Sequence, residues 1–145
     1  MRFQKIYRTG QIVNAELYTR LRVLDAEVFF ECGNEFKENR DWWVMVYKNK
    51  IIAYCGCLYS TDNVCIFVRA WVHKPYRGKG LQKRMIDLRL RAAKKNGCSA
   101  AITYTLTNNY PSANSLIKYG FKLYEPSYKW AGKDVLYFKK LLYAE

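Results

Sequence analysis

One turn near the middle of the chain carries the clearest fold signal, and it reads Val72-His73-Lys74-Pro75-Tyr76-Arg77-Gly78-Lys79-Gly80-Leu81-Gln82. It leads from an apolar strand into a long basic helix. The glycines let the backbone approach a phosphate because they carry no Cβ, and the first N–H groups of the helix have no partner within the helix. The helix dipole adds partial positive charge at the same place. The turn therefore predicts a binding site for a ligand that carries a diphosphate.

Alternating and amphipathic runs on both sides of this turn predict an α/β fold. Three strands rich in β-branched and aromatic residues precede it as an antiparallel meander, and Asn14 and Asn109 stand where helix caps belong. The helix that follows has one apolar stripe and exposes its lysines and arginines. The predicted order is a strand at 3–8, a helix at 14–32, a loop or short helix at 33–41, strands at 42–48, 51–59 and 64–72, a helix at 78–96, a strand at 99–107, a short helix at 109–119, and strands at 121–124 and 135–141.

Length and composition favour one soluble domain that spans residues 1–145. Half of the residues are hydrophobic, which is enough to bury a single core. No stretch approaches the roughly 20 apolar residues that span a bilayer, and the first residues lack the apolar region of a secretory signal. We therefore expect a cytoplasmic protein without a membrane partner.

The chain is strongly basic, because 25 lysines and arginines stand against 12 acidic residues, for a net charge of +13. Such a charge favours an acidic partner. Two interpretations stay open. A phosphate-rich cofactor and ordinary solubility use much of the charge, or the partner is a nucleic acid or an anionic protein substrate.

Metal and disulfide chemistry have little sequence support. The five cysteines are odd in number and none has the C-x-x-C spacing, so they are interpreted as reduced core thiols. His73 is the single histidine, and no carboxylates cluster. The chain therefore offers few ligands for zinc or iron, and we expect no metal.

The order of elements and motifs resembles the GNAT superfamily of N-acetyltransferases over roughly residues 42–142. Arg77 and Gly80 match the Arg and the first Gly of the family's turn, whereas Gln82 stands where the family has a small residue. A second segment agrees independently. There, Asn109, Ser112 and Gly120-Phe121 stand at the offsets of the family's Asn-x-x-Ala/Ser segment before Gly-Phe.

The resemblance implies a single α/β GNAT-like domain. Its central sheet is mixed, mostly antiparallel and twisted, with about seven strands, a splayed parallel pair and about four flanking helices. The splayed pair lets the pantetheine arm of acetyl-CoA, the implied co-substrate, pair with the backbone like an added strand. The implied cofactor-binding residues are Trp71, Val72, His73, Arg77, Gly78, Lys79, Gly80, Leu81, Gln82, Asn109 and Ser112. Asn109 is also interpreted as a plain helix cap, which is compatible with contact to the cofactor.

The implied chemistry needs a neutral amine, a donor to the thioester carbonyl and a proton for the leaving thiolate. The family's usual glutamate is absent from strand 64–72. His73 is a candidate base because a free imidazole titrates near neutral pH, and it is equally interpreted as structural. The other candidates for the base are Glu31, Glu35 and Asp62.

The family's usual acid, a tyrosine, is also absent, because Leu116 occupies its position. Ser112 and Tyr119 lie one helical turn away on either side, and Tyr110 stands at the start of the same helix. The candidate catalytic residues are thus Tyr119, Ser112 and His73. Tyr119 is also interpreted as packing beneath Phe121.

The first functional hypothesis is an acetyl-CoA-dependent N-acetyltransferase that modifies a primary amine by direct attack in a ternary complex. The acceptor is a protein lysine, a protein N-terminus or a small amine, in acidic surroundings rather than on a polycation. The alternatives are a nucleic-acid-directed base-modifying enzyme, similar to the phage Mom enzymes, and a non-catalytic module that binds coenzyme A or nucleic acid. Residues 14–41 and 124–134 are expected to select the acceptor, and the chain is expected to be a monomer or a homodimer.

Overall fold

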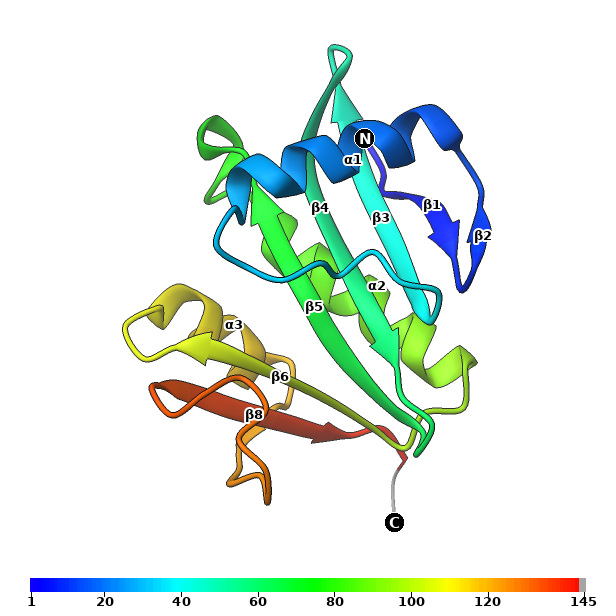
Figure 1. Ribbon diagram of the computed structural model, residues 1–145. Coiled ribbons are helices and arrows are strands. Elements are labelled where there is room, and N and C mark those ends of the chain that lie inside the picture. The colour runs from blue at the N-terminus through cyan, green and yellow to red at the C-terminus, as the bar shows by residue number, and fades with distance from the viewer. Residues whose placement is uncertain (144–145) are drawn as a thin grey trace. The chain divides into compact units, whose positions relative to one another are not determined.

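The computed structural model describes residues 1–143 (Figure 1). The chain forms two compact units. The first consists of Met1–Leu58 and Val68–Leu81, and the second of Tyr59–Phe67 and the chain from Gln82 onward. Strand β5 (Val64–Val72) contributes its first half to the second unit and its second half to the first.

The first unit is a largely antiparallel sheet with one long helix. Its strands are hydrogen-bonded in the order β2-β1-β3-β4-β5, and the β1–β2, β1–β3 and β3–β4 pairs are antiparallel. The bounds of its elements are β1 (Gln4–Arg8), β2 (Gln11–Ile12), α1 (Ala15–Val28), β3 (Arg40–Tyr47), β4 (Lys50–Tyr59) and the short 3-10 helix η1 (Lys74–Tyr76).

Helix α1 packs one face against this sheet (Figure 1). Asn14 caps it as predicted, since its side chain accepts a hydrogen bond from the N–H of Leu17 at 3.0 Å. The buried residues Leu17, Tyr18 and Leu21 recur at helical spacing. Tyr18 stacks on Tyr7 of β1 with ring centroids 4.8 Å apart, which holds the start of the helix on the sheet.

Trp42 and Gly56 pack closely in this core. They are paired across β3 and β4, and a Cβ on Gly56 would lie 2.7 Å from the indole ring of Trp42. On its other side, Trp42 stacks with Phe36 at 4.4 Å between ring centroids. The indole therefore fills the space that any larger residue at position 56 would need.

The second unit contains the parallel strand pair. Its strands are hydrogen-bonded in the order β5-β6-β8-β7, and β5 pairs in parallel with β6 from Val64↔Ala100 to Ile66↔Ile102. The other two pairs, β6–β8 and β7–β8, are antiparallel. The bounds of its elements are α2 (Leu81–Lys95), β6 (Ala100–Leu106), α3 (Tyr110–Lys118), β7 (Lys122–Leu123) and β8 (Val135–Leu141).

The predicted mixed, mostly antiparallel sheet is confirmed, with a few differences in extent. Residues 1–143 contain eight strands and three α-helices rather than about seven and about four, because β2 adds a strand and 33–41 forms no helix. The first helix ends at Val28 rather than at 32, since Phe29 leaves helical geometry (φ −117°, ψ 46°). The basic helix begins at Leu81, because Gly78 and Gly80 have left-handed backbones. The single functional domain stays a prediction.

In the described part of the chain, no helix is both long enough and apolar enough to cross a membrane.

Candidate active site

The glycine turn has the conformation that an anion-binding loop requires. Gly78 and Gly80 have φ values of 76° and 84°, a left-handed region that strains other residues. A Cβ built on either glycine would meet no atom within 4 Å, so this backbone borders open space. Because α2 begins at Leu81, the first turn of this helix follows directly, and the N-terminus of a helix is a favourable place for an anion.

The end of β5 is tied both to its neighbour and to the turn. The N–H of His73 donates to the carbonyl of Ile52 at 2.7 Å. Nε of Arg77 donates to the carbonyl of Val72 at 2.9 Å, so this guanidinium folds back over the strand end. Val72 and His73, which were predicted to pair with the pantetheine arm, thus each use one backbone group within the chain.

His73 lies in a row of aromatic rings. The ring of Trp71 is 5.8 Å from the imidazole and that of Tyr76 is 6.1 Å away. The row continues from Trp71 to Tyr54 at 5.7 Å and from Tyr76 to Tyr47 at 5.9 Å. These contacts fix the orientation of the half-buried imidazole next to the glycine turn.

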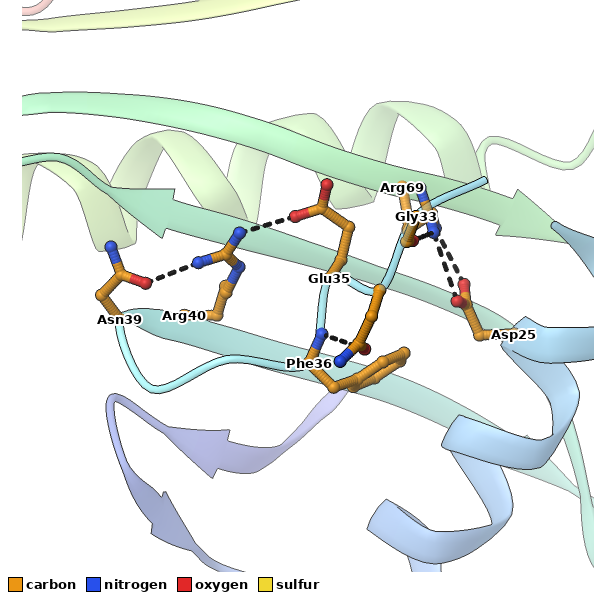
Figure 2. Close-up of polar contacts among 8 residues, drawn as sticks. Asp25, Gly33, Glu35, Phe36, Asn39, Arg40 and Arg69 are labelled. Carbon is orange, nitrogen blue, oxygen red and sulfur yellow. Dashed lines mark hydrogen bonds and ion pairs between the residues drawn. The ribbon is translucent and has the colours of Figure 1, made fainter. Parts of the chain in front are cut away.

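A buried ion pair joins α1 to the middle of β5. Nε of Arg69 lies 3.0 Å from Oδ1 of Asp25, which is only 5% exposed, and Nη2 of Arg69 donates to the carbonyl of Gly33 at 2.7 Å (Figure 2). The backbone of Arg69 is left-handed (φ 54°), a local irregularity of the strand. The hydroxyl of Tyr54 also donates to Oδ1 of Asp25, at 2.7 Å.

The contacts of this cluster shift the pKa values of Tyr54 and Arg69. Burial and the hydrogen bond to Asp25 raise the pKa of Tyr54 far above its ordinary value. Burial by itself would lower the pKa of Arg69, but the hydrogen bond and the charge of Asp25 raise it on balance. Tyr54 is therefore a neutral donor and Arg69 a permanent cation at neutral pH. The sequence offered no signal for Asp25, because it is far from β5 along the chain.

The segment after α1 is held by its own polar contacts, which Figure 2 shows. The N–H of Phe36 donates to the side chain of Asn34 at 2.9 Å, and Arg40 forms an ion pair with Glu35 at 2.8 Å. Of the carboxylates proposed as bases, Glu35 is thus engaged and Glu31 is exposed. Asp62 lies in the second unit and accepts a hydrogen bond from Ser60.

The second unit contains the candidates on α3. Asn109 caps this helix, since its side chain accepts a hydrogen bond from the N–H of Ser112 at 3.3 Å, so this interpretation is confirmed. Leu116 is 5% exposed and belongs to the core. Ser112 and Tyr119 are half-buried, whereas Tyr110 is 68% exposed. The turn residues from Arg77 to Leu81 belong to the first unit.

The cysteines are reduced thiols, and four of them are buried as expected. Cys32 differs, because it is exposed after the early end of α1. Within residues 1–143, no group of three or more histidine, cysteine, aspartate or glutamate side chains is arranged to hold a metal ion.

Comparison with known proteins identifies the family. The model of the acetyltransferase (GNAT) family matches residues 6–121. The chain belongs to the GNAT acetyltransferase family. It is therefore an acyltransferase, as predicted, and the glycine turn lies within the matched region. The comparison with curated proteins finds no match.

Solved structures of GNAT proteins share the fold. The aminoglycoside 6'-N-acetyltransferase from Enterococcus faecium has a TM-score of 0.74 at 12% identity, covering 100% of this chain and 99% of that one. A GNAT-family acetyltransferase from Staphylococcus aureus has a TM-score of 0.71 at 14% identity, covering 98% and 100%. A Bacillus subtilis acetyltransferase in complex with CoA has a TM-score of 0.67 at 16% identity, covering 98% and 99%. At these identities the similarity establishes the fold.

Proposed function

We propose that this GNAT protein transfers the acetyl group of acetyl-CoA to a primary amine by direct attack in a ternary complex, with residues 1–145 acting as one catalytic domain. The observation that carries the proposal is the conformation of the glycine turn. Two left-handed glycines with open space around them precede the first turn of a helix, which is where a diphosphate finds backbone donors.

The proposed cofactor contacts follow the chain through this turn. The backbone from Gly78 to Gln82 holds the diphosphate, and the exposed Lys79 adds positive charge beside it. Arg77 orients the turn through its hydrogen bond to the carbonyl of Val72. Trp71, Val72 and His73 pair with the pantetheine arm, and Asn109 and Ser112 contact the pantetheine or the adenine, as the family resemblance implies.

The proposed reaction forms an amide and releases free coenzyme A. The neutral amine attacks the thioester carbonyl, the C–N bond forms and the C–S bond breaks. A base removes a proton from the amine, and the leaving thiolate receives a proton to become a thiol. We assign the base to His73 and the acid to Tyr119 or Ser112. Tyr54 does not serve as the acid, because its raised pKa makes it a poor proton donor.

The proposed cofactor site is tested by linkage between ligand binding and thermal stability. Acetyl-CoA at about a hundredfold excess over its dissociation constant raises the unfolding midpoint by roughly 5 to 10 °C. The Arg77→Ala/Gly80→Asp variant loses this rise, because it removes the turn's guanidinium and adds a carboxylate where the phosphates bind. The measurement is a thermal melt with and without ligand.

The matched control is Arg8→Ala/Gly10→Asp in the β1–β2 turn, where Gly10 also has a left-handed backbone (φ 91°) and open surroundings. This control keeps the rise of the unchanged protein. If millimolar acetyl-CoA leaves the unfolding midpoint of the unchanged protein where it was, the glycine turn is not the cofactor site. The same conclusion follows if acetyl-CoA raises the midpoints of the two double variants equally.

A further inference from the structure

A cavity in the first unit lies between α1, the start of β4 and the end of β5. Its volume is about 490 Å³, and its lining includes Leu24, Glu27, Lys50, Ile51, Trp71 and His73. It thus contains His73, the proposed base, and Trp71 beside it. Only its α1 residues belong to segment 14–41, which is expected to select the acceptor; this cavity is here called the α1 cavity.

Two opposite charges line the α1 cavity without neutralising each other. Within residues 1–143, the side chains of Glu27 and Lys50 have neither an ion pair nor a hydrogen bond to the protein. Arg20 at the edge of the same cavity differs, because it donates to the carbonyl of Asn49 at 2.6 Å. One free carboxylate and one free ammonium group are therefore available to a ligand.

Apart from His73, the remaining lining residues of the α1 cavity are mainly apolar. Leu24 and Ile51 contribute aliphatic surface, and Trp71 contributes a half-buried indole held between Tyr54 and His73. Such walls favour an apolar body over a highly hydrated one. A ligand that uses the whole cavity thus combines an ammonium group, a carboxylate and an apolar part.

A second cavity of the same unit lacks this combination. It has a volume of about 540 Å³ and lies between α1 and the segment after it. Its single carboxylate, Asp25, is already bound to Tyr54 and Arg69, and its Arg22 guanidinium lies 5.9 Å from the ring centre of Tyr18. No free carboxylate in it holds an incoming ammonium group.

We infer that the α1 cavity binds the acceptor and that the acceptor is a free amino acid with an apolar side chain. This inference rests on the proposed function. Glu27 receives the ammonium group, Lys50 pairs with the carboxylate, and Trp71 packs against the side chain. One proton of the ammonium group passes to His73. The neutral nitrogen then attacks the thioester of acetyl-CoA, and a second proton from nitrogen ends on the departing sulfur. The products are the N-acetyl amino acid and free coenzyme A.

The test compares two acceptors, L-leucine and L-leucinamide, in the unchanged protein and in two variants. Lys50→Gln raises the KM for leucine about tenfold and leaves the KM for leucinamide unchanged, because only leucine carries the carboxylate. Glu27→Gln raises the KM for both, because both carry the amine. For each acceptor, the KM of each variant is compared with the KM of the unchanged protein. The two acceptors are not compared directly, since the amide group of leucinamide also lowers the basicity of its amine.

The matched controls are Lys122→Gln and Asp87→Asn, which change charges outside the α1 cavity and outside residues 14–41 and 124–134. They leave all KM values unchanged, and every variant keeps the KM for acetyl-CoA. An equal effect of Lys50→Gln on leucine and leucinamide would overturn the inference. The inference would also be overturned if the protein acetylated another amine but did not acetylate leucine, methionine or phenylalanine.

Direct binding separates this inference from the proposed function. Calorimetric titration of leucine without cofactor shows binding to the unchanged protein that weakens about tenfold in Lys50→Gln. If acetyl-CoA fails to bind while leucine binds in this way, the proposed function fails and the assignment of the cavity stands. If acetyl-CoA binds and is turned over while leucine shows no binding, the assignment fails alone.

Discussion

Tyr54 is a completely buried tyrosine that donates its hydroxyl hydrogen to Asp25. Its pKa is raised first by burial and then by the hydrogen bond and the charge of Asp25. The phenolate form would be desolvated and would lie beside a carboxylate, so the native state holds the proton firmly.

The raised pKa of Tyr54 predicts a loss of stability at alkaline pH. Tyrosine in the unfolded chain loses its proton near pH 10, whereas native Tyr54 keeps it, so above pH 10 the unfolded state binds fewer protons. The free energy of unfolding then falls with pH by about 1.4 kcal/mol per pH unit from this group, and below pH 10 the group adds no pH dependence. Urea unfolding of the unchanged protein and of Tyr54→Phe from pH 8 to 11 measures the difference.

Tyr54→Phe lacks the ionisable group, so its free energy of unfolding falls less steeply above pH 10. At neutral pH it is less stable by about 1.5 to 3 kcal/mol, because Asp25 loses a donor. Tyr128→Phe is the control, since Tyr128 is 76% exposed and this variant keeps the steep slope. Parallel pH profiles for all three proteins would contradict the prediction.

At the scale of the elements, Asp25 and Arg69 connect α1, β5 and the segment after α1. Both side chains are nearly buried, and the guanidinium also lies 4.8 Å from the ring centre of Phe29 at the end of α1. Removal of one partner leaves a buried charge without compensation, which is far more costly than removal of both.

A double-mutant cycle tests this connection. Asp25→Leu alone lowers the free energy of unfolding by about 3 to 5 kcal/mol, and the Asp25→Leu/Arg69→Met double variant regains most of that loss. The exposed pair Asp87 and Arg91 on α2 is the control, and its removal costs at most about 0.5 kcal/mol. Urea unfolding gives all values. If the double variant loses as much free energy of unfolding as the two single variants lose together, the two charges act independently.

Most elements were predictable because their signals are local. The caps at Asn14 and Asn109 act over a few residues, so the sequence places the starts of α1 and α3 correctly. The helix α2 was also predicted, but its start was placed at Gly78 rather than at Leu81, because Gly78 and Gly80 have left-handed backbones. The error at the end of α1 has a tertiary cause. Apolar spacing continues past Val28, but the chain turns away at Phe29 and reaches the carbonyl of Gly33 that Arg69 binds.

At the scale of the whole molecule, the net charge of +13 predicts weak, non-specific binding to nucleic acid. Cations exposed on α2 contribute to this charge, and they are Lys83, Arg84, Arg91, Lys94 and Lys95. Fluorescence anisotropy with a labelled DNA duplex is expected to show binding at about 50 mM salt that is lost by about 200 mM, because phosphate contacts release counterions.

The salt dependence also distinguishes the acceptor classes. Replacement of Lys83, Lys94 and Lys95 by glutamine makes the plot of log affinity against log salt less steep, while acetyl-CoA still stabilises the protein. Binding that persists above about 200 mM salt would instead favour the nucleic-acid-directed alternative, because base contacts depend less on salt than phosphate contacts do.

The α/β class, the order of the elements, the glycine turn and the GNAT resemblance could all be predicted from the amino-acid sequence. These features follow from backbone preferences, helix caps and periodicity over a few neighbouring residues. Tertiary packing was needed to show that Asp25 contacts Tyr54 and Arg69, which are 29 and 44 positions away, and that Glu27 and Lys50 line one cavity. Such contacts depend on how distant segments pack, and no local pattern in the chain encodes which side chains converge.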